Sequence, residues 1–451
     1  MEKSTISAYA HQEETTKFLI DNPYCLVTSD PGTGKTRSVL DAHIQWQGRT
    51  LVLAPLSILE AAWVDDIKKF QPDIKYGVAY AKNRKKVFED LSHEMVITNF
   101  EAVNFLVKNQ QYITTFDNLV IDEFTAFKNK NAQRSKNIQK LIEHFRRRVC
   151  MSGTPNTNSI LDLWHPVYLV DQGQRLGNRY YSYRNQVCTP QFNGFANVWI
   201  DKPGIEETVA DKLKDINIRF ALEDCIDLPD NIVRTVYTSL TPQVARMYKT
   251  LAEESVLYTR QGTINAINAG ARVKKLLQLV SGGVYDENGL TQYIHQDRYD
   301  LVMDLLDVRK HSLVAFNWKH ERDALVQLAE KRGYSYEVID GEIPAHKRSN
   351  IVERFQAGQL KVLFAHPQSA GHGLTLTKAT TAIWCSPTYN AEHFQQFNRR
   401  IHRSGQTQKT ETIMIAARDT WEEHVYKKLN GKLNRMESLL TILNDLHKEA
   451  A

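Results

Sequence analysis

The sequence predicts an α/β protein built from two parallel-sheet lobes with a largely helical insert between them. In both lobes, short apolar runs alternate with segments of helical periodicity, the pattern of buried parallel strands joined by helices. The chain has 451 residues, more than one hydrophobic core usually fills, so roughly two or three domains of about 150 residues are expected. No short-period repeat or low-complexity segment points to a solenoid or a disordered tail.

The first lobe is expected over residues 1–165. Each of its apolar runs is followed by polar or glycine-bearing residues, and open parallel sheets bind ligands at this carboxyl edge. Chemistry should therefore collect along that edge. The expected strands are Cys25–Thr28, Thr50–Leu53, Met95–Thr98, Leu119–Ile121 and Arg148–Met151.

Residues 166–296 are expected to form the mainly helical insert, because aromatic-rich and amphipathic helical patterns dominate there. The turn-forming residues Leu228–Asn231 precede a strand-like run near residues 231–239. We expect this strand to return to the first lobe.

The second lobe is expected over residues 297–451, where the alternation of strands and helices resumes. A charged, amphipathic helix from Trp421 to about Lys448 ends the chain and is expected to pack on this lobe. The expected strands are Ser312–Phe316, Ser335–Ile339, Lys361–Phe364, Thr381–Trp384 and Thr412–Ile415.

Composition is that of an ordinary globular protein, with 42% hydrophobic and 24% charged residues. No apolar run approaches the roughly 18 residues that a membrane helix needs. The net charge of +5 permits a nucleic-acid surface without requiring one. The five cysteines suggest neither a disulfide framework nor a zinc module. The first residues lack the apolar stretch of a secretory signal, so a cytoplasmic location is expected.

A glycine-rich turn, Ser29–Thr36, follows the first expected strand. Glycines there let backbone N–H groups approach phosphate oxygens, a lysine neutralises β- and γ-phosphate charge, and a threonine hydroxyl can ligate Mg²⁺. A serine, Ser29, stands where the strict pattern has its first glycine. The predicted nucleotide-binding residues of this loop are Pro31, Gly32, Thr33, Gly34, Lys35 and Thr36.

Two adjacent carboxylates, Asp122 and Glu123, end the apolar run that begins at Leu119. Asp122 can hold Mg²⁺ through water, and Glu123 can orient and deprotonate the attacking water. The predicted catalytic residues of the first lobe are therefore Lys35, Asp122 and Glu123, and the predicted metal ligands are Thr36 and Asp122.

A distant segment, Gln396–Gln406, offers arginines from the second lobe. A planar guanidinium that reaches the γ-phosphate from a second domain stabilises transition-state charge, and such arginines contribute on the order of 10³ to 10⁵ in rate. Arg400 and Arg403 are the candidates. The two lobes are therefore expected to close on one ATP, which predicts a motor rather than a simple hydrolase.

The order of these segments resembles that of the superfamily 2 helicases and, more closely, of the SNF2 family of double-stranded DNA translocases. The resemblance covers nearly the whole chain. Two departures in the acidic segment are Phe124 and Thr125, which replace the family's alanine and histidine. In the family, that histidine links ATP to motif III, which corresponds to Ser152–Asn158 of this chain. Here the histidine is absent. The segments of the first lobe that carry the resemblance are Tyr9–Gln12, Leu51–Leu59, Val96–Glu101, Asp122–Asn129 and Ser152–Asn158.

In the second lobe, Asp340–Arg348 resembles motif IVa and Ser369–Leu376 resembles motif V. Motif VI is the most specific match, because its family spacing falls on six residues of this chain. Those residues are Gln396, Arg400, His402, Arg403, Gly405 and Gln406.

The resemblance implies two RecA-like lobes that use ATP and Mg²⁺, with Gln12 reading adenine, Gly373 beside the nucleotide, and Ser152, Thr154 and Gln396 coupling ATP to movement. It also implies that strand-edge segments bind the DNA backbone without reading sequence. The predicted DNA contacts are Pro55, Leu56, Ser57, Thr98, Asn99, Asn317, Trp318, Lys319, Gly373 and Thr375. The tyrosines Tyr180, Tyr181 and Tyr183 receive no role.

The function implied is an ATP-dependent translocase on duplex DNA, in a compact phage or bacterial member of the family. Such a protein would act in the bacterial or phage-infected cytoplasm. Remodelling of branched DNA, by fork regression or branch migration, is the expected task in replication, recombination or repair. A strand-separating DNA or RNA helicase of the same superfamily is one alternative, and an ATP-gated DNA-binding protein that does not translocate is another.

Overall fold

The computed structural model describes residues 7–156, 158–192, 197–259, 262–265, 268–370 and 374–450. Their contacts divide the chain into two compact units. Unit 1 comprises the chain up to Asp227 together with the segment from Lys432 onward, and unit 2 comprises Leu228–Gly431. The predicted insert is therefore not a separate body, because its first part belongs to unit 1 and its second part to unit 2.

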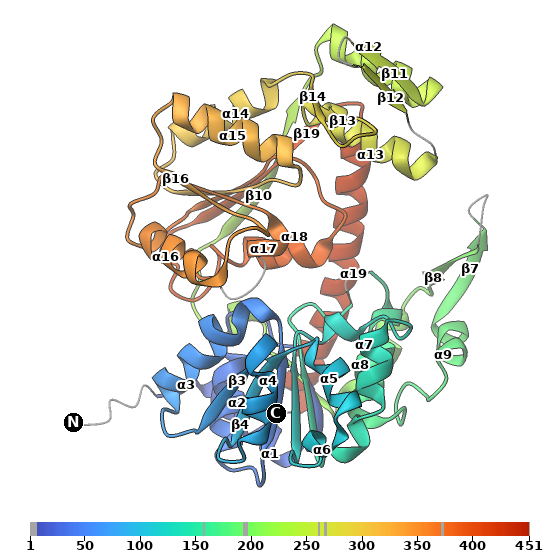
Figure 1. Cartoon of the computed structure of the whole chain (residues 1–451). Helices are drawn as coiled ribbons and strands as arrows, with labels where there is room; N and C mark the ends of the chain where they lie inside the picture. Colours follow the sequence, from blue (N-terminus) through green and yellow to red (C-terminus); the bar gives the residue numbers. More distant parts are fainter. Residues whose placement is uncertain are drawn as a thin grey trace. The chain divides into compact units, whose positions relative to one another are not determined.

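Unit 1 is built on a parallel sheet of seven strands in the described residues, in the order β3-β4-β2-β5-β6-β1-β9 (Figure 1). Neighbouring residues of a strand point to opposite faces, and both faces are buried: Leu51 and Leu53 enter one core, while Val52 and Ala54 enter another. The strands are β1 (Tyr24–Val27), β2 (Thr50–Ala54), β3 (Tyr76–Ala79), β4 (Met95–Asn99), β5 (Asn118–Asp122), β6 (Arg147–Met151) and β9 (Asn217–Ile218).

Helices cover both faces of this sheet, and a hairpin of β7 (Cys188–Phe192) and β8 (Asn197–Asp201) lies outside it (Figure 1). Short 3₁₀ turns lie at Leu56–Ile58, Ala81–Asn83, Phe124–Phe127, Ile142–His144 and Ile160–Leu163, and a π-helical turn at Leu59–Val64. The α-helices are α1 (Ala10–Asp21), α2 (Lys35–His43), α3 (Asp65–Phe70), α4 (Arg84–Glu89), α5 (Ala102–Lys108), α6 (Gln110–Ile113), α7 (Gln133–Gln139), α8 (Trp164–Asp171), α9 (Tyr180–Val187), α10 (Ile205–Leu213) and α11 (Leu222–Cys225).

Unit 2 holds a second parallel sheet, of six strands in the described residues, in the order β10-β19-β18-β15-β17-β16. Inward-facing residues such as Val314, Phe364 and Ile383 form its core. The strands are β10 (Asn231–Thr238), β15 (Ser312–Ala315), β16 (Tyr336–Ile339), β17 (Val362–Ala365), β18 (Thr381–Trp384) and β19 (Thr410–Ala417).

The expectation that the strand near residues 231–239 returns to the first lobe is wrong. β10 pairs along its whole length with β19, from Asn231 opposite Thr410 to Thr238 opposite Ala417. Side chains reinforce the pairing, since Thr410 Oγ1 donates to Asn231 Oδ1 at 2.9 Å and Arg234 pairs with Glu411 at 3.2 Å. The long strand β19 offers a full edge for a partner, which the sequence of β10 alone does not reveal.

The helices of unit 2 flank its sheet and carry two further hairpins, β11–β12 and β13–β14. A small separate core joins α12, α13 and their hairpins through Leu251, Ile264 and Leu279. The elements are α12 (Pro242–Glu254), β11 (Val256–Thr259), β12 (Gly262–Asn265), α13 (Ala269–Val280), β13 (Gly283–Tyr285), β14 (Thr291–Tyr293), α14 (Asp297–Asp307), α15 (Lys319–Lys331), α16 (Ala345–Gln356), α17 (Pro367–Ala370) and α18 (Ala391–Asn398).

The last helix, α19 (Trp421–Ala450), begins in unit 2, but its residues from Lys432 onward belong to unit 1. Leu439 and Leu443, one turn apart, are buried in the larger core of unit 1. The expectation that this helix packs on the second lobe therefore holds only for its first turns. The amphipathic pattern predicted the helix but not which core receives its apolar face.

Candidate nucleotide-binding site

The phosphate loop connects the buried strand β1 to the first turn of α2. Gly32 and Gly34 have φ angles of 94° and 85°, a left-handed backbone that glycine adopts without strain. Thr33 Oγ1 donates to the carbonyl oxygen of Asp30 at 2.9 Å and closes the turn. Lys35 and Thr36 then lie at the start of α2, where backbone N–H groups and the helix dipole favour an anion.

The Lys35 ammonium group lies across the loop and donates to the carbonyl oxygens of Ser29 at 2.8 Å and Asp30 at 3.0 Å. Burial lowers the pKa of Lys35, and the carboxylates of Asp122, Glu123 and Asp30 oppose that shift. A phosphate oxygen is a stronger acceptor than a neutral carbonyl. The amine is therefore placed to exchange these carbonyls for the phosphates of a nucleotide.

The loop is anchored from a distant segment that the sequence did not single out. β9 pairs in parallel with β1, and Arg219 forms a buried ion pair with Asp30 at 2.9 Å. The Ser29 hydroxyl accepts the N–H of Phe220 at 3.1 Å, and Asp30 Oδ2 accepts that of Leu222 at 3.1 Å. Ser29, which departs from the glycine of the strict pattern, thus serves as an anchor for this segment.

Gln12 on α1 lies directly against the loop. Its Nε2 donates to the Thr33 carbonyl at 3.1 Å, and its Oε1 accepts the N–H of Tyr9 at 3.1 Å. A Cβ atom at Gly34 would lie only 2.1 Å from Gln12 Nε2, so glycine is the residue that allows this approach. The amide of Gln12 is thereby fixed beside the nucleotide loop, as a purine-reading residue requires.

The two carboxylates lie where β5 ends. Asp122 Oδ2 accepts the indole N–H of Trp63 at 3.0 Å. Burial raises the pKa of Asp122, while the Lys35 ammonium and the Trp63 N–H pull it back. Glu123 has a φ of 64°, which is uncommon for a residue with a side chain and occurs at sites where the surrounding structure imposes it.

Glu123 is linked by hydroxyl groups to the loop that follows β6. Ser152 Oγ donates to Glu123 Oε1 at 2.5 Å, and Thr125 Oγ1 donates to the same oxygen at 2.9 Å. Ser152 Oγ in turn accepts the N–H of Thr154 at 3.1 Å. Thr125, at the position of the family's histidine, therefore contacts Glu123 itself, and Ser152 makes the contact between Glu123 and this loop.

The same loop touches the phosphate loop. A Cβ atom at Gly153 would lie 2.5 Å from Pro31 Cδ, so a glycine is needed for the two loops to pack. The Thr154 hydroxyl is buried and has no hydrogen-bond partner among the described residues. Pro31 of the phosphate loop therefore packs directly against the segment that carries Ser152 and Thr154.

The donor set fits a magnesium ion held mainly by a nucleotide. In the part of the chain that the structure describes, no three His, Cys, Asp or Glu side chains form a metal cluster. Mg²⁺ bound with phosphates needs only one or two protein ligands. The carboxylates of Asp122 and Glu123 act electrostatically on Lys35, so both lie near the phosphate loop.

In unit 2, the predicted arginines lie just after α18 and converge on one carbonyl. Arg400 Nη1 and Arg403 Nη1 donate to the carbonyl oxygen of Leu374 at 3.2 and 3.0 Å, and Arg400 Nε donates to that of Gln396 at 2.9 Å. Arg400 and Gln396 are buried, whereas Arg403 is half-buried. Gly373, also predicted here, lies outside the described residues.

Two other residues of that segment have structural partners. His402 Nε2 lies 3.0 Å from the carbonyl oxygen of Pro229. Gln406 Nε2 donates to three carbonyl oxygens, those of Thr377, Ala379 and Ile401. These contacts hold the segment in place, so the specific spacing of motif VI reflects both its arginines and the side chains that fix them.

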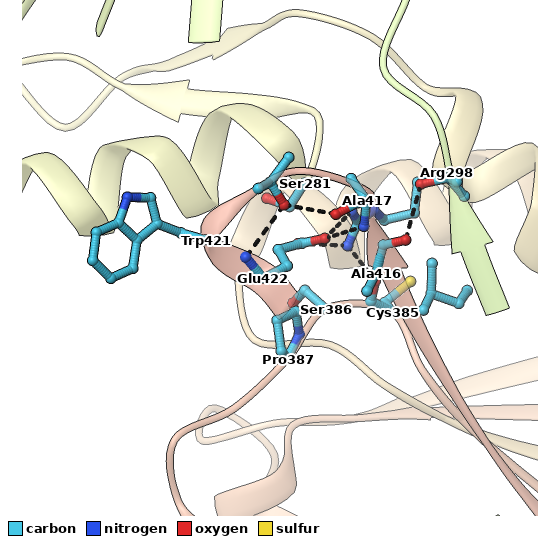
Figure 2. Close-up of polar contacts among 12 residues, drawn as sticks. Ser281, Arg298, Cys385, Ser386, Pro387, Ala416, Ala417, Trp421 and Glu422 are labelled. Atoms are coloured by element: carbon cyan, nitrogen blue, oxygen red, sulfur yellow. Dashed lines mark hydrogen bonds and ion pairs between the residues drawn. The ribbon is translucent and has the colours of Figure 1, made fainter. Parts of the chain in front are cut away.

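The carboxyl edge of the second sheet is organised around a buried ion pair between Arg298 and Glu422 (Figure 2). The Arg298 guanidinium donates to both Glu422 carboxylate oxygens, at 2.8 and 2.6 Å, and to the carbonyl of Cys385, which follows β18. Glu422 Oε2 also accepts the N–H of Ala417, the last residue of β19. Four elements, α14, β18, β19 and α19, are thus joined at one point.

The predicted DNA contacts of unit 1 follow β2 and end β4. Leu56 is exposed at 47%, and Ser57 is partly exposed. The two predicted contacts on β4 form hydrogen bonds within the protein. Thr98 Oγ1 donates to the Ala79 carbonyl at 2.6 Å, and Asn99 Oδ1 accepts from Arg84 at 2.9 Å. Leu56 and Ser57 are thus the freer surface, whereas Pro55 is buried. Arg84 is a cation at this edge to which the sequence assigned no contact.

The predicted contacts of unit 2 lie beside the buried ion pair. Asn317 Nδ2 donates to the Ser386 carbonyl at 3.0 Å, and its backbone N–H donates to Glu321 at 2.7 Å. Trp318 and Thr375 are partly exposed, whereas Lys319 is exposed and pairs with Glu342 at 3.5 Å. Asn317 and Trp318 thus lie in the loop that follows β15, whereas Lys319 begins α15 and Thr375 lies beyond α17.

The loop, its lysine and the acidic pair have the arrangement expected of a phosphate-binding site of the P-loop class. Comparison with known families matches residues 8–283 to the SNF2-related domain and residues 297–405 to the helicase conserved C-terminal domain. Because the first match covers more than half of the chain, the protein belongs to the SNF2-related family. Its two domains are those of a DNA-dependent ATPase of the helicase class.

Relatives differ widely in length. Putative protein p41 of Acyrthosiphon pisum secondary endosymbiont phage 1 is 26% identical over 471 residues, which cover 97% of this chain and 98% of that protein. An uncharacterized ATP-dependent helicase of Mycoplasma genitalium is 24% identical, and the match covers 95% of this chain and 42% of the relative. The DNA annealing helicase and endonuclease ZRANB3 of Mus musculus is 22% identical, over 90% of this chain and 38% of that protein.

Among solved structures, the Sulfolobus solfataricus SWI2/SNF2 ATPase core in complex with dsDNA is similar, with a TM-score of 0.46 and 21% identity. The match covers 96% of this chain and 93% of that one. Within the described residues, no helix is both long and apolar enough to cross a membrane.

Proposed function

We propose that the protein is an ATP-driven translocase on double-stranded DNA that remodels branched DNA, by fork regression or branch migration. The observation that carries the proposal is that the predicted ATP-site residues are divided between the two units. Unit 1 holds the phosphate loop and the acidic pair, whereas unit 2 holds two arginines that converge on a single carbonyl. Turnover that needs groups from two bodies moves one body relative to the other at each cycle.

In the proposed cycle, Lys35 and the backbone of Gly32–Thr36 bind the phosphates of ATP. Glu123, held by the hydroxyls of Ser152 and Thr125, orients the attacking water and accepts its proton. Mg²⁺ held by Thr36 and Asp122 would neutralise phosphate charge when bound. Arg400 and Arg403 would exchange the Leu374 carbonyl for γ-phosphate oxygens, a stronger acceptor for a guanidinium.

Two observations support duplex or branched DNA as the substrate. The predicted contacts lie at strand ends, where backbone N–H groups and hydroxyls can bind phosphates without reading bases. Among the relatives, one bears the name DNA annealing helicase and endonuclease.

The test is DNA-stimulated ATP hydrolysis by the full chain, compared across single-stranded, duplex, forked and four-way-junction DNA. The proposal expects duplex and branched DNA to stimulate more than single-stranded DNA, and it expects displacement of a triplex-forming strand from duplex DNA. Stimulation by single strands or RNA alone would indicate a strand-separating helicase. Stimulation by duplex without triplex displacement would indicate an ATP-gated binding protein, and either result would overturn the proposal.

A further inference from the structure

A pocket of about 600 Å³ in unit 1 lies away from the phosphate loop and combines aromatic rings with cations. Its aromatic members are Trp164, Tyr180 and Tyr181, and its cations are Lys130, Lys136 and Arg179. None of the residues that line it is a carboxylate. Among the described residues, these three cations form no ion pair, so the pocket has positive charge that the protein itself does not neutralise.

Two of the three tyrosines of this region, Tyr180 and Tyr181, line the pocket, and Tyr180 also packs against the core. Tyr183 is buried, and its hydroxyl donates to the Ile160 carbonyl at 3.2 Å. Tyr181 is 59% exposed, so its ring is accessible to a ligand. Tyr180 packs edge-on against Trp164, with 5.5 Å between the ring centres, and this contact holds the Tyr180 ring in place.

Cations already lie over the exposed rings. The Lys130 ammonium is 4.8 Å from the centre of the Tyr180 ring and 4.6 Å from that of Tyr181. Arg184 lies 5.0 Å from the Tyr181 ring and 3.7 Å from that of Trp199 on β8. A flat π-face with mobile cations beside it suits a nucleotide, since a base can stack on the ring while the displaced amine binds its phosphate.

The pocket is joined to the acidic pair through the chain. The segment that leaves Glu123 passes through the turn Phe124–Phe127 and then supplies Lys130 and Asn131 to the pocket. Lys128, on the same segment, pairs with Asp162 at 3.8 Å. Occupancy of the pocket would therefore act on a segment whose other end carries the catalytic carboxylate.

We infer that this pocket binds an unpaired segment of DNA and gives the protein its preference for branched over continuous duplex DNA. Bases in a duplex are stacked on each other and cannot present a face to Tyr181, whereas the unpaired strand at a fork can. The inference rests on the proposed function, because it names the part of the branched substrate that this surface takes.

The first measurement is the affinity of the full chain for a short fluorescent oligothymidylate, followed by fluorescence anisotropy. Tyr181→Ala should weaken binding about fivefold or more, the loss expected for one base stacked on one ring. Tyr181→Phe keeps the ring and should bind as the wild type does. Tyr293→Ala is the matched control, since Tyr293 is similarly exposed at 55% but lies in unit 2.

The second measurement is the ratio of ATP turnover with forked DNA to turnover with blunt duplex. This ratio should fall towards one in Tyr181→Ala and in Lys130→Ala but not in Tyr293→Ala. A wild-type protein that duplex DNA does not stimulate would refute the proposed function. A stimulated protein whose Tyr181→Ala variant keeps the wild-type ratio would refute only the pocket.

Two further outcomes would overturn the inference. Equal losses of affinity for oligothymidylate and for duplex in Tyr181→Ala would make the pocket a general backbone contact. Tighter binding of oligouridylate than of oligothymidylate would assign it to RNA. Photocrosslinking of a bromodeoxyuridine-containing strand gives a direct check, because the adduct should map to the peptide that contains Tyr180 and Tyr181.

Discussion

Glu123 is the residue whose surroundings are most closely defined. Its backbone is held in the left-handed region, and two hydroxyls donate to one of its carboxylate oxygens. Both features aim the carboxylate in one direction, which a base that must meet a single water molecule requires. Lys35, by contrast, makes only exchangeable bonds to carbonyl oxygens, as suits a group that binds a ligand.

The two residues should therefore fail in different ways. Lys35→Ala should weaken ATP binding and abolish turnover, because the phosphates lose their buried cation. Glu123→Gln should keep ATP binding but lower turnover by about 10²-fold or more, since the amide cannot accept the proton. Calorimetry with ATP and release of phosphate measure the two effects. Glu143→Gln, on an exposed glutamate, is the control and should change neither; a Glu123→Gln variant that turns over normally would rule out this base.

Glu321 gives a prediction about pH. It is fully buried and accepts the N–H groups of Asn317 and Trp318, and burial raises its pKa to about 7. A carboxyl whose pKa is higher in the folded than in the unfolded protein contributes stability that is complete at low pH. That contribution is lost as the pH rises from the unfolded value towards 7.

Glu321→Gln mimics the neutral carboxyl and should remove this loss. Between pH 5 and 8, the unfolding free energy of the wild type should fall relative to that of Glu321→Gln by an amount on the order of 2 kcal/mol. Urea unfolding at several pH values measures the difference. A constant difference between the two proteins across this range would show that Glu321 is ionised throughout.

At the scale of elements, the segment from β9 to α11 is the support of the phosphate loop. Ile216, Ile218 and Phe220 accept successive N–H groups of β1 and the loop, from Leu26 to Asp30. The buried pair of Arg219 and Asp30 then fixes the point where the strand becomes the loop. Supporting contacts such as these determine how precisely a loop of glycines can be positioned.

Arg219→Met should therefore affect the nucleotide site although Arg219 lies outside the loop. Removing one partner leaves Asp30 buried without its counter-charge, which typically costs about 3 to 5 kcal/mol. The unfolding temperature and the affinity for ATP should both fall, and ATP should raise the unfolding temperature of the variant less than that of the wild type. Lys249→Met breaks an exposed pair with Glu253 and should change stability little. If both variants unfold alike, the anchoring role is refuted.

The strands that line the site could be predicted from the sequence because each is a short buried apolar run with a polar end. β2, β4, β5, β6 and β18 begin and end within one or two residues of expectation. Three kinds of element could not be predicted. β9 has only two residues, β3 follows a turn without a marked apolar run, and the partner of β10 depends on which sheet leaves an edge free.

The residues of the site divide in the same way. Lys35, Glu123 and Ser152 could be found because their spacing in the chain defines the motifs. The contacts that Trp63 and Arg219 make could not, because an indole or a guanidinium that contacts a distant carboxylate has no local signature. Tyr181 was left without a role for a related reason: a run of tyrosines does not reveal which ring faces solvent.

For the whole molecule, the central prediction concerns Arg403. It lies in unit 2, whereas every loop residue that binds phosphate in the proposed cycle lies in unit 1. Arg403→Ala should leave ATP binding nearly unchanged but reduce DNA-stimulated hydrolysis by about 10³-fold. Filter binding of labelled ATP and turnover with duplex DNA test the two halves of this statement. Arg399→Ala is a neighbouring control, and full activity in Arg403→Ala would exclude an ATP site shared by the two units.

The hydroxyl pair on Glu123 has one more consequence. A histidine at the place of Thr125 would gain or lose a proton near neutrality and would change its grip on the carboxylate accordingly. Neither threonine nor serine titrates there, so both hydroxyls can donate to the Glu123 carboxylate in a mildly acidic and in a mildly alkaline medium. In the proposed cycle, the contact between Glu123 and these hydroxyls therefore adds no group that titrates near neutrality.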